Sequence, residues 1–296
     1  AVWAQSDPGL SLGDLWAERG RLMAAAGPEP APPAVKNAWP RLRDLAGAGV
    51  LDLAQDEAEA WRAAIKGLPL KDLDLRLFAF LSAYKAHVGD YAGWVRLQYG
   101  NFGLLVRGRP DEQKILAQRR FFPLAFPGPV LEAAEEFQLH PALLLSVIRT
   151  ESYYQPDVLS AANARGLMQL LPSTGQKISH RLGAVLPHPA LLFSPETNIR
   201  FGACYLSALI QEFGGQLPLA IASYNAGPFN VKRWVLQAGD CTLEEFIEMI
   251  PFEQTNAYVK KILGAMYQHR LLFSSRSHCP NLDAPLRPVF LDEINF

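Results

Sequence analysis

The chain has 296 residues, with 28 lysines and arginines against 29 aspartates and glutamates, and 49% of its residues are hydrophobic. This length and apolar content are sufficient for two domains with a sizeable core. The near-zero net charge, without a basic block, argues against a nucleic-acid-binding protein that neutralises phosphates. No apolar run approaches the ~18 residues needed to cross a bilayer, so we expect no transmembrane helix.

Residues 1–120 are predicted to form successive short helices. "DEAEAWRAAIKG" ends on a glycine, and "DYAGWVRLQYG" begins on Asp90, a favourable N-cap residue. These helical hairpins favour an α-solenoid-like domain, with an irregular all-α bundle as the alternative. The opening "AVWAQSDPG" is compatible with the end of a secretory signal whose charged and apolar parts are absent from this sequence.

The composition shifts near residue 120, where three prolines follow a basic stretch in "RGRPDEQKILAQRRFFPLAFPGPV". We therefore predict a second domain at 121–273 and a C-terminal extension at 274–296. Almost no β pattern is present, so the chain is predicted to be all-α. Within the second domain, helices are predicted from Pro141 to about Ser152, from Pro195 to Gly214-Gly215, and over "LPLAIASYNAG" up to Gly227.

Glu151 occupies an unusual position for a charged residue. Counting back by three, four and seven residues reaches Ile148, Val147 and Leu144, so on the helical period the carboxylate shares a stripe with three apolar side chains. That stripe should face the interior. Because an isolated buried charge is too costly to persist, the carboxylate is expected to be paired, neutral or catalytic.

Two interpretations of Glu151 remain open at this level. Arg149 and Arg165 could pair with the carboxylate in a structural role. Alternatively, Glu151 is a general acid whose pKa is raised by poor solvation. A glutamate with a pKa of ~4.3 is protonated about 0.2% of the time at pH 7, whereas one raised to ~6 is protonated about 10% of the time. Burial would make proton donation feasible at neutral pH.

A polar loop follows this helix. In "YQPDVLSAANARGLMQ", Pro156, Ser160, Asn163 and Gly166 disfavour a helix. A polar loop beside an inward carboxylate indicates the wall of a cleft. Ser160 and Gln169 can hydrogen-bond sugar hydroxyls or amides, and "SYNAG" brings a tyrosine and an asparagine to a helix end. Taken singly, each is better interpreted as a loop cap or a solvated amide.

Four segments carry a resemblance to a known family. "ESYYQPDVLSAANARGLMQLLPST", "NIRFGACYLSALIQEFG", "IASYNAGPFNVKRWV" and "IPFEQTNAYVKKIL" together resemble, in order and spacing, the catalytic domain of bacterial soluble lytic transglycosylases. The resemblance covers roughly residues 121–270 and implies a lysozyme-like α fold. The first part of the chain resembles, more weakly, the end of the helical superhelix that precedes this domain in the family.

The resemblance also implies roles for individual residues. Glu151 would be the single catalytic acid and base. Tyr224 would hydrogen-bond near its carboxyl group, and Asn225 would support that corner. Glu248, just ahead of "IPFEQT", matches an acidic position that meets the peptide stem of the substrate. The glycan groove would be lined by Ser160, Met168 and Gln169.

Two positions depart from the family pattern. Asn163-Ala164 stands where the family usually has Gly-Ala, and asparagine is a tolerable replacement because it enters left-handed backbone conformations readily. Gln254 stands where the family usually has glutamate, so a charge-based role there is in doubt.

The resemblance implies cleavage of the bond between N-acetylmuramic acid (MurNAc) and N-acetylglucosamine (GlcNAc), with closure of a 1,6-anhydro ring. Ordinary glycosidases use two carboxylates, whereas this motif supplies one, since Asp157 is expected to be a turn residue or a surface charge. A goose-type-like lysozyme that hydrolyses the same bond is the enzymatic alternative. A catalytically silent peptidoglycan-binding scaffold is the alternative from another class.

The same resemblance implies partners and a location. The partners would be peptidoglycan glycan strands, with peptide stems as a further contact, in the periplasm or outside the cell. No metal or cofactor is expected. Cys204, Cys241 and Cys279 lack metal-ligand spacing, and a Cys241–Cys279 disulfide is conceivable in an oxidising compartment.

Overall fold

The computed structural model describes residues 85, 89–96, 122–273 and 281–290, without the side chains of 271–273. The chain divides into two compact units, one formed by residues 13–123 and one by residues 1–12 together with 124–296. Most of the helical hairpins predicted for residues 1–120, and part of the extension predicted at 274–296, lie outside the described residues.

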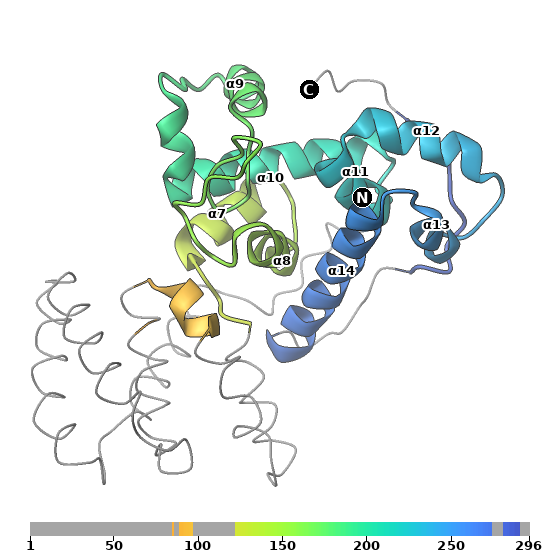
Figure 1. Ribbon diagram of the computed structural model, residues 1–296, viewed down its shortest axis with the longest axis horizontal. Helices are drawn as coiled ribbons and strands as arrows, with labels where there is room; N and C mark the ends of the chain where they lie inside the picture. Colours follow the sequence, from red (N-terminus) through yellow and green to blue (C-terminus); the bar gives the residue numbers. More distant parts are fainter. Residues whose placement is uncertain (1–84, 86–88, 97–121, 274–280, 291–296) are drawn as a thin grey trace, which may run out of the picture. The chain divides into compact units, whose positions relative to one another are not determined.

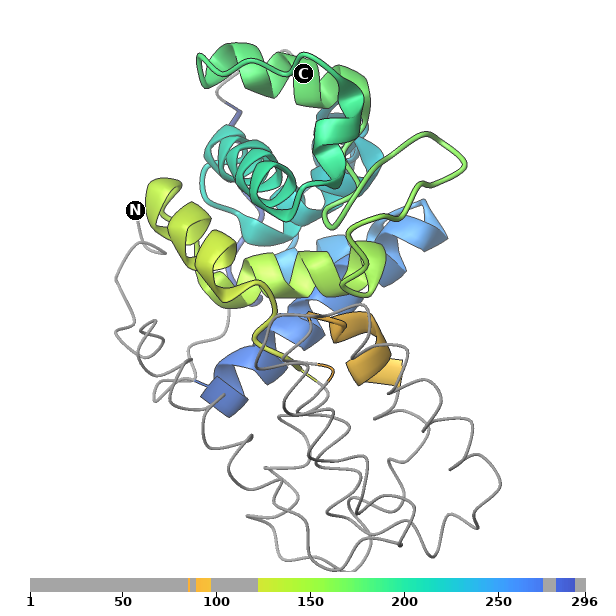
Figure 2. The ribbon, with the colours of Figure 1, turned by 90° about the vertical axis from the view of Figure 1, so that its left-hand side faces the viewer.

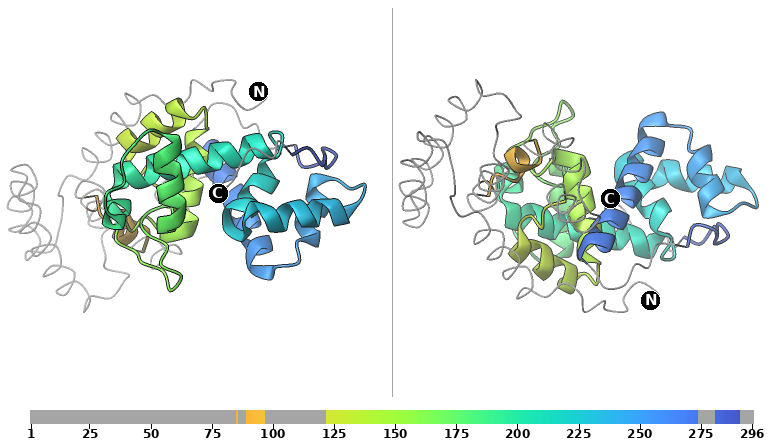
Figure 3. Two further views of the ribbon diagram at one scale, coloured as in Figure 1. Left: turned by 90° about the horizontal axis from the view of Figure 1, so that it is seen from above. Right: turned by 90° about the horizontal axis from the view of Figure 1, so that it is seen from below.

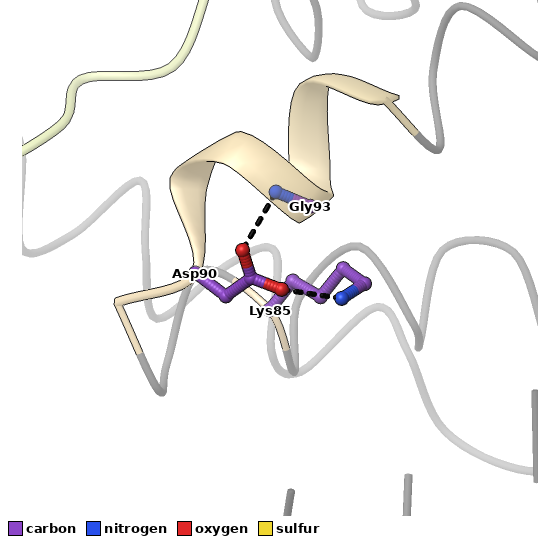
Figure 4. Close-up of polar contacts among 3 residues, drawn as sticks. All are labelled: Lys85, Asp90 and Gly93. Carbon is purple, nitrogen blue, oxygen red and sulfur yellow. Dashed lines mark hydrogen bonds and ion pairs between the residues drawn. The ribbon is translucent and has the colours of Figure 1, made fainter. Parts of the chain in front are cut away.

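The described part of the first unit contains the start of a helix over residues 91–96. Oδ1 of Asp90 accepts a hydrogen bond of 2.6 Å from the backbone N–H of Gly93, and Oδ2 forms a 2.5 Å ion pair with Nζ of Lys85 (Figure 4). The predicted N-cap at Asp90 is thereby confirmed.

The second unit is built from helices (Figure 1). They are α7 (Pro127–Glu136), α8 (Pro141–Ser152), α9 (Pro172–Arg181), the 3-10 helix η2 (Pro189–Phe193), α10 (Pro195–Glu212), α11 (Leu217–Ala226), α12 (Pro228–Ala238), α13 (Leu243–Met249) and α14 (Glu253–Phe273). The described residues include isolated β-bridges but no β-strand. The prediction of an all-α fold is confirmed for this part of the chain.

The three helices predicted for this unit form where the sequence signals indicated. Proline occupies the first turn of α8 and of α10, where its missing N–H is no loss. Beyond α10, Gly214 and Gly215 adopt positive φ angles of 60° and 82°, which end the helix. Gly227, with φ 81°, ends α11 in the same way.

Two helices cross the unit and connect its other elements. α10 packs against α7, α9 and η2, and it also packs against α11. α14 packs against α8, α11 and α13. Figure 3 shows α12 and α13 lying apart from α7–α9, with α10 extending between the two groups. Burial of apolar side chains in these contacts provides the main driving force for the fold.

The loop between α8 and α9 contains residues 153–171. It extends beyond the end of α8 and turns back (Figure 2). Leu159 and Leu170 each form an isolated bridge with Arg165, so the loop folds on itself as a tight hairpin-like structure. Tyr153 and Tyr154, directly after α8, both have left-handed φ angles, of 50° and 65°.

Residues 281–290 are tied to the helices of the same unit. The Gln216 side chain donates to the backbone carbonyl of Arg287 at 2.6 Å and accepts from the Arg287 N–H at 2.8 Å. The carbonyls of Ala284 and Leu282 accept from the first backbone N–H groups of α13. Because helix N-termini carry N–H groups without intrahelical partners, this segment supplies part of the α13 cap.

Candidate active site

Glu151 lies in the last turn of α8. Residues 142–149 of this helix are buried, including Leu144, Val147 and Ile148 on the same stripe, so the predicted inward orientation of that stripe is confirmed. Glu151 itself is partly exposed. The carboxylate therefore lies where the buried helix meets accessible space, which is the arrangement that a substrate-facing acid needs.

Tyr258 provides a hydrogen bond to this carboxylate. It lies in the second turn of α14, is 7% exposed, and its hydroxyl donates to Oε1 of Glu151 at 2.5 Å. The bond joins residues that are 107 positions apart in the chain. The packing of α8 against α14 thus brings the acid and its phenol donor together.

The environment of Glu151 places its pKa near neutrality. Burial raises the pKa from 4.5 to about 7, and the hydrogen bond from Tyr258 opposes this rise. Desolvation disfavours the charged form of a carboxyl group, whereas a hydrogen-bond donor stabilises it. At pH 7 the group is therefore about half protonated. Such a group can donate a proton and later accept one.

A second phenol, Tyr224, lies close to this carboxyl group, and a third, Tyr205, lies beside Tyr224. Burial, followed by the charge of Glu151, raises the pKa of Tyr224 and of Tyr258 well above 10. Burial raises the pKa of Tyr205 to about 12, and its ring lies 5.2 Å from that of Tyr224 between centroids. All three phenols stay protonated at neutral pH, so Tyr224 and Tyr258 act as hydrogen-bond donors and Glu151 is left to exchange the proton.

Tyr224 donates its hydroxyl hydrogen to the backbone carbonyl of Met168 at 2.9 Å. The phenol that bonds directly to the Glu151 carboxylate belongs to Tyr258. Tyr224 is nevertheless close enough to Glu151 for the carboxylate charge to influence its pKa. It thus connects the surroundings of the acid to the polar loop.

Ser160 and Gln169 stabilise the loop through their side chains. The Ser160 hydroxyl accepts a 3.0 Å hydrogen bond from the N–H of Ala164. The Gln169 amide donates to the carbonyls of Val158 and Gly166 at 3.2 and 2.8 Å. Both residues are partly exposed. The amide oxygen of Gln169 remains as an acceptor for a group outside the loop.

Met168 is fully buried, so its side chain presents no surface to a bound sugar in this structure. A Cβ atom at Gly202 would lie 2.3 Å from its sulfur, which shows how closely the side chain packs on α10. The backbone of Met168 is held on both sides, since its N–H donates to Oδ1 of Asn198 at 2.7 Å and its carbonyl accepts from Tyr224.

Asn225 and Glu248 lie on other elements of the unit. Oδ1 of Asn225, near the end of α11, accepts a 2.8 Å hydrogen bond from the hydroxyl of Thr255. Because Thr255 precedes Tyr258 by one turn of α14, this bond fixes the part of α14 from which the phenol reaches Glu151. Glu248 is exposed near the end of α13 and pairs with Lys260 at 2.7 Å.

The two departures from the family pattern differ in their consequences. Asn163 adopts a left-handed φ of 65°, as expected for a residue that replaces glycine. Its Oδ1 also accepts a 3.1 Å hydrogen bond from the guanidinium of Arg165. Gln254 is exposed in the first turn of α14.

Sequence reasoning missed two residues at this site, Tyr258 and Asn198. The signal for Tyr258 is the stripe of Thr255, Tyr258, Val259 and Ile262, all of them buried, which follows the helical period on α14. Asn198 is fully buried on α10, where a buried amide requires hydrogen-bond partners.

Within the described ranges, no group of histidine, cysteine and acidic residues is arranged to hold a metal ion. Asp157 is exposed. Cys204 is a buried free thiol and Cys241 a partly buried one, while Cys279 lies outside the described residues. None of the described helices is long and apolar enough to span a membrane.

Comparisons with known proteins show which family this part of the chain resembles. Residues 128–247 match the family model of the Transglycosylase SLT domain. The soluble lytic murein transglycosylases of Salmonella typhimurium and Escherichia coli (strain K12) are each 35% identical to this chain, over 153 and 145 residues. These matches cover 50% and 48% of this chain, but this chain spans only 24% and 22% of the relatives' length.

The fold is shared with solved structures. The structure matches the 70 kDa soluble lytic transglycosylase from Escherichia coli with a TM-score of 0.61 at 23% identity, covering 88% of this chain and 46% of that one. The helices around Glu151 thus form a lysozyme-like all-α domain. The family-model match over residues 128–247 and the 35% identity to soluble lytic murein transglycosylases confirm the resemblance inferred from the four sequence segments.

Proposed function

We propose that this chain is a peptidoglycan lytic transglycosylase that cleaves the β-1,4 bond between MurNAc and GlcNAc and leaves 1,6-anhydro-MurNAc ends. The observation that carries the proposal is the carboxyl group of Glu151. It lies at the end of a buried helix, receives a hydrogen bond from Tyr258, and has a pKa of about 7. The family match and the names of the relatives support the same activity.

The proposed reaction uses this one carboxyl group twice. Protonated Glu151 donates its proton to the oxygen that links the two sugars, and the bond between that oxygen and the anomeric carbon of MurNAc breaks. The substrate's own acetamido group supports the anomeric centre. The resulting carboxylate then removes the proton from the 6-hydroxyl of MurNAc as its oxygen bonds to the anomeric carbon. The acid is thus restored without the addition of water.

The structure supplies a physical reason for the two steps. A pKa of about 7 keeps both protonation states of Glu151 accessible at neutral pH, so neither proton transfer is strongly uphill. When Glu151 is charged, the hydrogen bond from Tyr258 stabilises the carboxylate. Tyr258 thereby favours the state that accepts the second proton.

The remaining site residues are proposed to bind the substrate. Ser160 and Gln169 contact the glycan from the loop, where both are partly exposed. Met168 supports these two residues through its hydrogen-bonded backbone and its buried side chain, without contacting the glycan through that side chain. Tyr224 and Asn225 support the wall beside Glu151, and the exposed Glu248 is available to a peptide stem. Peptidoglycan is accordingly the proposed partner, in the periplasm or outside the cell.

Product analysis tests the proposal. Purified sacculi are incubated with the protein, and the released muropeptides are analysed by mass spectrometry. Anhydro-MurNAc ends, lighter than reducing ends by one water, are expected to dominate. Reducing ends would instead identify a goose-type-like lysozyme, which uses water for the same bond cleavage.

A catalytically silent scaffold is tested with the same material. If neither the parent protein nor Glu151→Gln releases muropeptides while both bind sacculi, the chain is a binding protein. The raised pKa of Glu151 favours the enzyme, because a desolvated carboxyl group without a function is costly to retain.

A further inference from the structure

Asn198 forms the densest set of side-chain hydrogen bonds at the base of the polar loop. It lies in the first turns of α10 and has 0% exposure. Its Nδ2 donates to the carbonyls of Leu192 and Arg165 at 2.6 and 2.9 Å. Its Oδ1 accepts from the N–H of Met168 at 2.7 Å. One side chain therefore satisfies three backbone groups from two separate segments of the chain.

Both amide hydrogens of Asn198 are used on carbonyl oxygens, so the orientation of the amide is fixed. If the two ends of the amide were exchanged, its oxygen would face two carbonyls and its NH₂ would face the Met168 N–H. Because buried polar groups without partners are costly, the loop can adopt this backbone only while the amide keeps this orientation.

The surrounding backbone is shaped to fit this amide. Gly166 has a φ of 75°, and a Cβ atom at that position would lie 2.5 Å from Nδ2 of Asn198 and 2.2 Å from the Leu192 carbonyl. One turn along α10 from Asn198, Gly202 leaves room for the Met168 side chain. The loop thus packs closely against α10 and η2, with glycines at the positions where a Cβ atom would clash.

The same contacts determine where Gln169 lies. Gln169 follows Met168, whose N–H is bound by Asn198 and whose carbonyl is bound by Tyr224. Gln169 has a left-handed φ of 49°. Since Tyr224 is close to Glu151, the chain of contacts from Asn198 to Met168 to Tyr224 fixes the loop relative to the acid.

We propose that Asn198 is a positioning residue that holds the backbone of residues 165–168 in the conformation that presents Gln169 to a glycan. This inference rests on the proposed function, and it extends that function to a residue that touches neither the substrate nor Glu151. Its loss is expected to weaken glycan binding and to leave the proton chemistry of Glu151 unchanged.

Two variants and one control test the proposal. Asn198→Asp keeps the size and the acceptor but removes both donors, and Asn198→Ser is the milder change that keeps one possible donor. The matched control is Ser207→Ala. Ser207 is also on α10 and also donates to a backbone carbonyl, that of Phe137 at 3.1 Å, but this bond lies away from the loop. Urea unfolding first confirms that each variant is folded under the assay conditions.

The variants are compared on soluble, uncross-linked glycan strands. For Asn198→Ser we expect KM to rise about five- to tenfold, which corresponds to the loss of roughly one net hydrogen bond. We expect kcat to stay within about twofold and the pH profile of kcat to keep its midpoint, since Glu151 is untouched. Hydrogen exchange should accelerate in peptides covering 160–171 and remain unchanged in peptides covering α8. Asn198→Asp should show the same pattern more strongly.

Several outcomes would overturn the proposal. An unchanged KM in a folded Asn198→Ser variant contradicts it. An equal fall of kcat and kcat/KM, with KM unchanged, also contradicts it. So does an unchanged rate of hydrogen exchange at residues 160–171. Either result would indicate that Asn198, like Ser207, does not position the loop for the glycan. If the parent protein releases no fragments, the proposed function fails, and the dissociation constants of parent and variant for the same strands decide the role of Asn198.

Discussion

Glu151 and the loop of residues 158–170 are close together in the chain, but different forces determine their properties. Burial at the end of α8 is the main influence on the Glu151 carboxyl group, and the hydrogen bond from Tyr258 modifies it. The loop, in contrast, is held by several hydrogen bonds between its backbone and the side chains of Asn198, Tyr224 and Gln169. The pKa of Glu151 is therefore set mainly by desolvation, whereas the conformation of the loop is set by hydrogen-bond geometry.

The difference has a practical consequence for substitutions. A change at Glu151 alters which charges exist, so its effects should depend on pH. A change in the loop network alters where groups lie, so its effects should appear in binding and in stability at any pH. The predictions below test this separation in turn.

The largest effect is expected for Glu151→Gln. Glutamine keeps the shape of the side chain but cannot donate or accept the transferred proton, so kcat should fall by about a thousandfold or more. Muropeptide release from sacculi measures this loss. Glu132→Gln on α7, an exposed position, serves as the control and should retain the parent rate. A Glu151→Gln protein as fast as the parent would remove Glu151 from the mechanism.

Tyr258→Phe should have the next largest effect. It removes the hydrogen bond that lowers the pKa of Glu151, so that pKa should rise above about 7. Activity that requires protonated Glu151 should then extend to higher pH by roughly one pH unit, with a fall in kcat of about tenfold because the carboxylate is less stabilised. The pH profile of kcat measures both effects.

Tyr267→Phe provides a matched control for this substitution. Tyr267 lies on the same helix and also has a phenol, but it is 43% exposed. Its loss should leave the pH profile of kcat unchanged. A profile that does not move in Tyr258→Phe would contradict the idea that this hydrogen bond tunes the acid.

The pH dependence of stability provides a third test. The folded-state pKa of Glu151, about 7, exceeds its ordinary value of 4.5, so the contribution of Glu151 to stability should be lost as the pH rises from 4.5 to 7. This loss should reach about 3 kcal/mol at pH 8. Glu151→Gln should therefore be more stable than the parent by that amount at pH 8 and about equally stable at pH 4, as measured by urea unfolding.

His269 changes stability with pH in the opposite direction to Glu151, which provides a second check on this prediction. Burial, followed by the charges of Arg149 and His140, lowers the pKa of His269 from 6.5 to about 3. Because only the unfolded state binds this proton, stability should fall as the pH falls from 6.5 towards 3. Between pH 4.5 and 6.5 the two groups oppose each other, so the parent curve should be nearly flat. In Glu151→Gln the fall due to His269 should become visible.

Local sequence patterns predicted α8, α10 and α11 because proline starts, glycine stops and helical periodicity act over a few residues. They also placed Glu151 on an inward stripe. They did not predict Tyr258 as its partner, because that contact depends on how α8 packs against α14. The left-handed conformations of Tyr153 and Tyr154 were also missed, since a bulky residue rarely adopts them without tertiary contacts.

Gly166→Ala tests the geometric side of the comparison. The added Cβ atom would lie 2.2 Å from the Leu192 carbonyl, and the φ of 75° is strained for alanine, so a loss of about 3 kcal/mol in the free energy of unfolding is expected. Gly183→Ala is the matched control. Gly183 also has a positive φ, of 60°, but nothing lies within 4 Å of the added atom, so about 1 kcal/mol is expected. Equal losses in the free energy of unfolding for the two variants would show that the close contact at Gly166 does not contribute to the destabilisation.

The smallest effect concerns Asn163, the residue that departs from the family pattern within the loop. Its φ of 65° suits glycine and asparagine, so Asn163→Gly should change the free energy of unfolding by no more than about 0.5 kcal/mol, while Asn163→Ala should lose about 1 kcal/mol. Its exposed hydrogen bond to Arg165 adds little, because water can replace it. Both variants should keep the pH profile of kcat, since the backbone conformation of the loop does not alter the burial of Glu151. A shift of that profile in Asn163→Ala would show that the loop also controls the solvation of the acid, and the two regions would then have to be treated as one.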